Sequence, residues 1–119
     1  MTVRDIVKTL DGVLLTGEDL LDVDIEAACG ADLMSDVMAF VKENVVLLTG
    51  LVNPQSIRTA DLMDIKVLVF VRGKVLPKDM IAEAERNSMA IITTKYSMFL
   101  ACGKLYEAGI KGGGIREIC

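Results

Sequence analysis

Three short apolar runs dominate the second half of the chain, and none of them alternates between apolar and polar residues. They cover 45–49, 67–71 and 90–94 and begin about 22 residues apart, and each is followed by a segment with helical spacing of apolar residues. Continuous runs of this length are typical of parallel strands covered on both faces, and the segments between them supply the helical crossovers. The pattern therefore predicts an α/β fold, a single domain with a central, mainly parallel sheet flanked by helices.

Capping residues mark the ends of the expected helices. Thr2 and Asp5 have capping-box spacing at the start of a first helix, which we expect Gly12 to end. Asn53 precedes Pro54, a natural pair of N-cap and first helical residue. Ser35 is expected to cap a further helix, which carries Val37, Met38 and Val41 inward. Pro77 is expected to open another helix. The last helix is expected to be capped by Ser97 and to end at Gly109.

The first half carries two weaker strand signals. Residues 13–15 form a short apolar run, and residues 22–27 alternate strictly between charged and apolar positions, which predicts a half-buried edge strand. The acids of the second segment would share one wet face, and a solvated edge explains them more simply than a cation site. We expect Asp32 to complement the dipole of the helix that follows it.

The amino-acid composition argues against several kinds of catalytic and metal site. The chain has no histidine, which excludes an imidazole base and a histidine-ligated metal. Its three cysteines lack C-x-x-C spacing, which argues against an iron–sulfur cluster and fits a reduced, cytoplasmic protein. The sequence therefore recommends no catalytic residue, no metal and no cofactor.

The length and net charge of the chain limit the number of its domains and the classes of its binding partners. The 119 residues fit one domain, which we assign to 1–111, followed by a flexible tail over 112–119 that begins with three glycines. The net charge of −4 disfavours nucleic acid, and apolar runs of about five residues fall short of the roughly 20 that a membrane span needs. The net charge is −7 over residues 1–50 and +3 over 51–119, so the second half leaves room for an anion site.

The parallel strands predict where a ligand would bind. In open α/β sheets, ligands sit outside the carboxyl ends of the strands, where each following helix offers its N-terminus. Three basic side chains and several hydroxyl groups stand there, so we expect the phosphate of a nucleotide or another small molecule. The alternative is that these are ordinary turn, cap and surface residues, because both common nucleotide-binding glycine motifs are absent. The candidate residues are Thr49, Gly50, Arg72, Gly73, Lys74, Thr94, Lys95 and Ser97.

The last predicted helix carries a second apolar strip beside its core-facing positions. Phe99, Gly103 and Tyr106 follow an i, i+4, i+7 spacing. A helix that is apolar over more than one stripe is either central or faces a partner. Because a domain of this size has little interior to spare, we expect this strip to be the interface of a homodimer, most simply a two-fold one.

Four segments resemble the DRTGG-domain family, in particular its small stand-alone bacterial and archaeal members. The segments are TVRDIV (2–7), LLTGEDL (14–20), ADLMSDVMA (31–39) and SMFLACGKLYEAG (97–109), so the resemblance covers about residues 1 to 110. It implies an α/β fold similar to the N-terminal domain of HPr kinase. It also implies a regulatory or dimerising module, of the kind found beside CBS domains, rather than a catalytic one.

The motif that names this family is altered here. Leu51 and Val52 follow Gly50, where the family has Asp-Arg, and Arg72-Gly73-Lys74 stands where the family has Thr-Gly-Gly. The glycines at 50 and 73 are the parts of the motif that persist.

Two functions follow from these observations. The first is a non-enzymatic, dimeric regulatory module that senses a nucleotide or phosphorylated small molecule at the strand ends. The alternative, based on the second apolar strip of the last helix and on the altered motif, is an accessory subunit that binds no small molecule. The resemblance implies a hydrogenase-like or kinase-like protein partner for it. An enzyme would need a tuned lysine, cysteine or carboxylate, and no spacing in the sequence recommends one.

Overall fold

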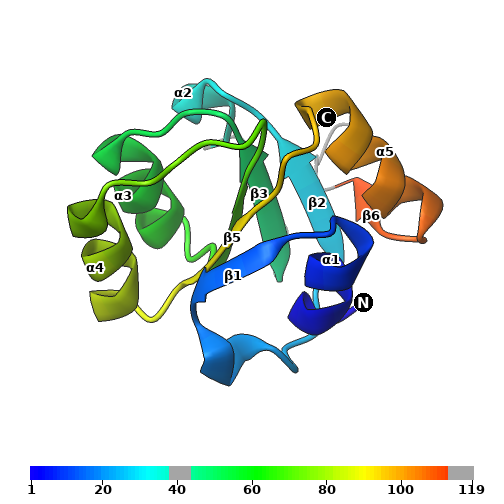
Figure 1. The fold of residues 1–119 in the computed structure, drawn as a ribbon, viewed down its shortest axis with the longest axis horizontal. Helices are drawn as coiled ribbons and strands as arrows, with labels where there is room; N and C mark the ends of the chain where they lie inside the picture. The colour runs from blue at the N-terminus through cyan, green and yellow to red at the C-terminus, as the bar shows by residue number, and fades with distance from the viewer. Residues whose placement is uncertain (38–43, 113–119) are drawn as a thin grey trace.

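The apolar runs lie at the centre of a mixed sheet in the computed structural model, which describes residues 1–37 and 44–112 (Figure 1). Within these residues the sheet has six strands in the order β1-β5-β4-β3-β2-β6, and only β1 runs antiparallel to its neighbour. The strands are β1 (Val13–Thr16), β2 (Ala27–Gly30), β3 (Val45–Thr49), β4 (Val67–Phe70), β5 (Ala90–Thr93) and β6 (Lys111–Gly112). The helices are α1 (Val3–Thr9), the 3-10 turn η1 (Glu18–Leu20), α2 (Met34–Val37), α3 (Pro54–Leu62), α4 (Lys78–Arg86) and α5 (Met98–Glu107).

The three predicted strands run parallel and end at one edge of the sheet. Thr49 of β3 pairs with Phe70 of β4, and Phe70 pairs with Thr93 of β5. We call this edge, with the loops 31–33, 50–53, 71–77 and 94–97, the carboxyl rim. The predicted α/β fold with a parallel centre is confirmed.

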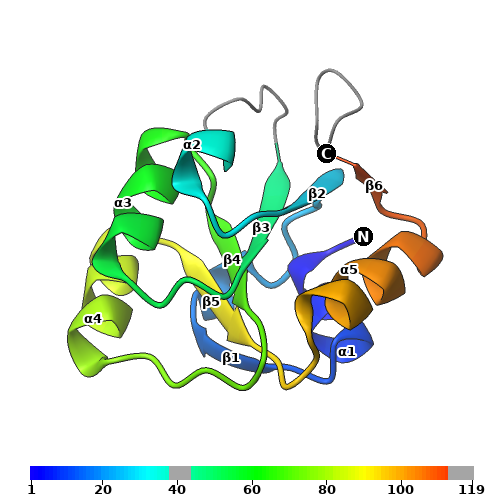
Figure 2. The same ribbon diagram turned by 90° about the horizontal axis from the view of Figure 1, so that it is seen from above.

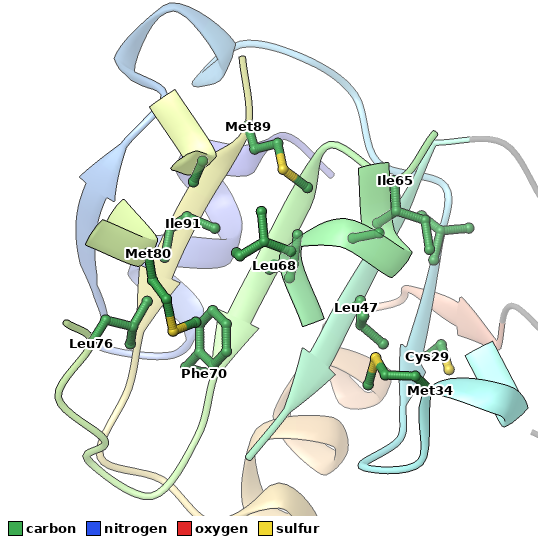
Figure 3. Packing of buried hydrophobic residues seen from close by; sticks show 14 of the residues in the cluster. Cys29, Met34, Leu47, Ile65, Leu68, Phe70, Leu76, Met80, Met89 and Ile91 are labelled. Atoms are coloured by element: carbon green, nitrogen blue, oxygen red, sulfur yellow. The ribbon is translucent and has the colours of Figure 1, made fainter. Parts of the chain in front are cut away.

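Helices cover both faces of the sheet, as Figure 2 shows from above. The helices α3 and α4 cover one face, where Phe70 points toward Met80 of α4 inside a fully buried cluster (Figure 3). The helices α1 and α5 cover the other face, and α5 lies so close to β2 that a Cβ at Gly30 would meet Sγ of Cys102 at 2.8 Å. Burial on both faces explains why the central strands are continuously apolar. None of the described helices is long and apolar enough to cross a membrane.

The chain leaves the neighbouring strands β4 and β5 toward opposite faces. β4 leads to α4 on one side of the sheet, and β5 leads to α5 on the other (Figure 2). Ligands of open α/β sheets commonly bind where neighbouring strands diverge in this way. The predicted basic residues belong to the two loops at this point.

The edge strand predicted over residues 22–27 is wrong, because the strand starts only at Ala27. The preceding segment bonds mainly to the start of α1 and makes an isolated antiparallel bridge between Asp24 and Thr2, while the N–H of Glu26 donates to the carbonyl of Asn44 at 2.9 Å. The carbonyl groups of Leu21 and Val23 accept hydrogen bonds from the first turn of α1, at 2.9 and 3.1 Å. These N–H groups have no partner inside the helix, so the segment satisfies them and buries Ile25 between its exposed acids.

Most of the predicted caps are present. Thr2 and Asp5 form the capping box, and the side chain of Asn53 accepts from the N–H of Gln55 at 2.8 Å. After α1, however, Asp11 rather than Gly12 takes the left-handed conformation, with φ 47°.

Two predicted segments overlap residues outside the described ranges. The helix predicted to be capped by Ser35 starts at Met34, so Ser35 lies inside its first turn, and the predicted positions 38–41 lie outside the described residues. Of the predicted tail, residues 113–119 also lie outside them, and Gly112 belongs to β6, a short strand that the sequence did not predict.

Candidate ligand site at the carboxyl rim

Arg72 follows β4 in a left-handed backbone conformation. Its φ is 65°, and so is that of Gly73. The N–H groups of Arg72 and Gly73 donate to the carbonyl oxygens of Tyr96 and Thr94, at 2.8 and 2.9 Å. These bonds join the turn to the loop that follows β5. A non-glycine residue in this conformation is strained and persists only where its surroundings hold it.

The side chain of Arg72 reaches across the rim to Gly50, the residue after β3. A Cβ at position 50 would collide with Nη2 of this arginine, so the guanidinium lies on bare backbone and the close approach requires glycine. Gly50 is buried, whereas Arg72 is exposed. Among the side chains that the structure describes, those of residues 1–35 and 44–111, no acid forms an ion pair with Arg72.

A carboxylate is hydrogen-bonded to the backbone of Gly50. Oδ1 of Asp32 accepts hydrogen bonds from the N–H of Gly50 at 2.7 Å and from the hydroxyl of Thr49 at 3.2 Å. Standard bond lengths then place this carboxylate within about 7 Å of the Arg72 guanidinium. The N–H at the end of β3 is therefore occupied by a carboxylate of the protein itself.

Besides the expected role at the start of the following helix, Asp32 has a second one, because its side chain bonds to the end of β3 and the loop after it. Sequence reasoning missed this role because it placed the preceding strand at 22–27. With the strand at its observed position, Ala27–Gly30, Asp32 follows a strand end and belongs to the carboxyl rim. An acid two residues beyond a strand was the signal that could have identified it.

Two of the predicted hydroxyl groups hold the fold together. Thr94 is buried, and its hydroxyl donates to the carbonyl of Leu10 at 2.7 Å and accepts from the N–H of Tyr96 at 3.2 Å. Ser97 caps α5 and accepts from the N–H of Leu100 at 3.2 Å. The proton of the Thr94 hydroxyl is thus already committed to Leu10.

The two predicted lysines complete a basic group at the loops after β4 and β5. Lys74 and Lys95 are exposed and, like Arg72, have no ion-pair partner in the part of the chain that the structure describes. Next to them, the ammonium of Lys104 lies 5.1 Å from the centre of the Tyr96 ring, a cation–π contact. The rim therefore presents three cations and one carboxylate around the exposed end of the sheet.

A hollow of about 440 Å³ lies elsewhere, between segments 24–27 and 108–111 at the opposite edge. The first of these segments carries Asp24 and Glu26, and the second carries Lys111. None of the predicted rim residues lines this hollow. Within the described ranges, no three histidine, cysteine or acidic side chains group as metal ligands would.

The predicted strip on α5 faces away from the core. Phe99 and Tyr106 are 85% and 74% exposed, and a Cβ at Gly103 would meet nothing within 4 Å. The core contacts of this helix come instead from Ala101 and Leu105, which are fully buried. Burial in the core of the monomer, the default for such a strip, is excluded for these residues.

No protein-family model matches the chain, and no curated protein matches it. Among solved structures, the fold is similar to the CBS and DRTGG domains of the regulatory region of Clostridium perfringens pyrophosphatase, in complex with the activator diadenosine tetraphosphate. The TM-score is 0.73 at 18% identity, and the match covers 87% of this chain and 45% of that chain, so this chain spans less than half of the region it matches. At this identity the similarity shows the fold, an α/β domain like that of the DRTGG-containing neighbour, and membership of the DRTGG family stays a prediction.

Proposed function

We propose that this protein is a non-enzymatic regulatory module that binds a nucleotide or another phosphorylated small molecule at the carboxyl rim and works as a homodimer. One observation carries the ligand proposal: the exposed guanidinium of Arg72 lies against the bare backbone of Gly50, and no acid among the described side chains forms an ion pair with it. The regulatory part is supported by the fold neighbour, a regulatory region in complex with a nucleotide activator.

The chemistry of the rim favours a phosphate ester over free phosphate. A guanidinium binds two phosphate oxygens at once in a fixed geometry. The ammonium groups of Lys74 and Lys95 add positive charge and can bind a phosphate from several directions. Oδ1 of Asp32 accepts from the N–H of Gly50 and from the hydroxyl of Thr49, while Oδ2 has no hydrogen bond to a described residue. A carboxylate repels phosphate but accepts hydrogen bonds from the hydroxyl groups of a ribose. A ligand that carries both groups, as a nucleotide does, can bind both the basic side chains and the carboxylate.

A regulatory rather than catalytic role is supported by the state of the polar groups at the rim. The hydroxyl of Thr94 is committed to Leu10, and the carboxylate of Asp32 is bonded to Gly50 and Thr49. A catalytic centre needs a nucleophile or base held within reach of a reacting group. The one hydroxyl that is hydrogen-bonded to a carboxylate among the described rim residues belongs to Thr49, which donates to Oδ1 of Asp32 at 3.2 Å but is fully buried and therefore out of reach of a substrate.

A thermal-shift series with AMP, ADP, ATP and inorganic phosphate tests the proposal. A ligand at about 100 times its dissociation constant adds roughly 2.7 kcal/mol of stability, which such a series detects readily. We expect a shift with at least one nucleotide, a smaller one with inorganic phosphate, and loss of the nucleotide shift in Arg72→Gln. The matched control is Arg86→Gln, an exposed arginine in the last turn of α4, at the opposite end of that helix from the rim.

The absence of any shift at millimolar concentrations of all four compounds would remove the sensing proposal. An equal shift in Arg72→Gln and in the unaltered protein would show binding elsewhere and remove the site. The accessory-subunit alternative would then be the stronger one, because it needs no small molecule.

A further inference from the structure

We propose that two copies of this chain pack α5 against α5 in antiparallel directions, around a two-fold axis that passes beside Gly103. The inference rests on the homodimer proposed above and adds which helices meet, in which direction and through which contacts. It follows from the order of side chains along the exposed face of α5.

Gly103 lies at the centre of this face. At 100° per residue, Phe99, Gly103 and Tyr106 lie within about 60° of one another around the helix axis. The two aromatic side chains are exposed, and the space above Gly103 is open. The face is therefore a shallow notch with an aromatic ring on either side of it along the helix.

This face is complementary to a copy of itself only when the helices run antiparallel. A two-fold axis beside Gly103 exchanges the two ends of the strip, because Phe99 and Tyr106 lie at nearly equal distances from it along the helix. Phe99 of each copy then lies against Tyr106 of the other, as an isologous interface requires. The two glycines meet at the centre, where the lack of side chains lets the helix axes approach toward the short end of the 8–10 Å range.

Charge favours the same direction. Glu107 is the last residue of α5, where the negative end of the helix dipole disfavours a carboxylate. In the antiparallel pair, Glu107 lies beside the first turn of the second copy's α5, which is the positive end of that helix and follows Lys95. A parallel pair would instead place Glu107 beside Glu107.

The size of the contact sets the expected strength. A stable interface buries about 800 Å² on each partner, and an aromatic side chain contributes 150–250 Å². Phe99 and Tyr106, with the half-exposed Leu100, supply roughly half of what a stable dimer needs. We therefore expect a dimer that dissociates on dilution into the micromolar range.

Sedimentation velocity of the full chain over a concentration series measures this equilibrium. Gly103→Gln fills space that is open in one copy, so we expect it to fold as a monomer and to lose the dimer. Phe99→Glu should also be monomeric. The matched control is Leu62→Glu, which charges another exposed apolar helical residue, 73% exposed at the end of α3, and should keep the dimer.

Cysteine cross-linking in a Cys119→Ser background shows whether the two α5 helices run parallel or antiparallel. With Gly103→Cys we expect a self-linked dimer under mild oxidation, because this position meets its own copy at the axis. Phe99→Cys alone should give no such product. A mixture of Phe99→Cys and Tyr106→Cys chains should give one, and the Cys119→Ser chain is the control for the remaining cysteines.

Each other outcome overturns the inference in a distinguishable way. Self-linking of Phe99→Cys would show parallel helices. A dimer that survives both Gly103→Gln and Phe99→Glu would show that another surface forms it, and the proposed homodimer would stand without this interface. A chain that is monomeric at every concentration would remove both, while nucleotide binding at the rim would remain a separate measurement.

Discussion

Replacing Thr94 with valine separates a residue that serves the fold from one that serves a ligand. The sequence places this threonine among the candidate ligand contacts. In the structure its side chain is buried, and its hydroxyl joins β5 to the turn after α1 by donating to the carbonyl of Leu10 at 2.7 Å. Valine keeps the shape of the side chain and removes the hydroxyl.

The expected loss in the free energy of unfolding follows from the two backbone groups that lose a hydrogen-bond partner in Thr94→Val. The carbonyl of Leu10 loses a donor, and an unsatisfied acceptor at a buried site costs about 1–3 kcal/mol. The N–H of Tyr96 also loses its acceptor, but Tyr96 is partly exposed, so water can replace part of that bond. We therefore expect Thr94→Val to lower the free energy of unfolding by about 1–3 kcal/mol, and the melting temperature by roughly 4–12 °C.

Urea denaturation measures this loss, with Thr93→Val as the control. Thr93 is the neighbouring residue on β5, is half-buried, and makes no side-chain hydrogen bond within the described chain, so its replacement should cost less than about 0.5 kcal/mol. The nucleotide-induced shift proposed above should survive in Thr94→Val. A fully stable Thr94→Val that has lost nucleotide binding would refute the assignment of this hydroxyl to the fold.

Three further predictions follow from single contacts. Asp32→Asn keeps an oxygen that can accept from the backbone and removes a negative charge beside the basic group. It should tighten inorganic phosphate binding about 2- to 5-fold in titration calorimetry, and unchanged or weaker binding would argue against an anion site there. Phe70→Ala removes one of the largest fully buried side chains and should cost about 3–5 kcal/mol in urea denaturation, whereas the exposed Leu62→Ala should cost less than about 0.5 kcal/mol; similar costs for both would contradict the burial. The N–H and hydroxyl of Thr2 lower the pKa of Asp5 below its ordinary value, so the stability that this cap adds is present above about pH 4 and is lost as the pH falls through the lowered pKa. The difference in melting temperature between Asp5→Ala and the unaltered protein should therefore be constant from pH 7 to pH 5 and shrink below about pH 4.

The centre of the sheet was predictable because burial on both faces leaves a direct trace in the sequence. The strands β3, β4 and β5 carry unbroken apolar runs, and their parallel pairing follows from the helices between them. The strand β2 was not predictable in the same way. It consists of Ala27–Gly30, small residues with little strand preference, beside a segment whose alternation is stronger. That segment satisfies the first turn of α1, a tertiary contact that no local pattern encodes.

The place of the candidate site was also predictable, whereas its internal contacts were not. Parallel strands of similar length must end at one edge, so Thr49, Arg72 and Thr94 had to share a rim. Which side chains cross from one loop to the next depends on the strand order and on the direction of each turn. The approach of Arg72 to Gly50 and the bond from Asp32 to the same glycine both depend on β2, β3 and β4 being neighbours.

The left-handed backbone conformation at position 72 favours glycine over the arginine that is present. A left-handed conformation costs a non-glycine residue about 1–2 kcal/mol, and a glycine would avoid that cost while losing about 0.5–1 kcal/mol through its freer unfolded chain. Arg72→Gly should therefore be at least as stable as the unaltered protein, and the two hydrogen bonds from positions 72 and 73 to the loop after β5 can still form. If the guanidinium serves a ligand, this variant should retain stability and lose the nucleotide-induced shift, because the turn remains and the charge on Gly50 is gone. A large loss of stability would instead mean that the arginine is held for its packing on Gly50, and the rim would then lose the feature that distinguishes it from the loops of any other α/β domain.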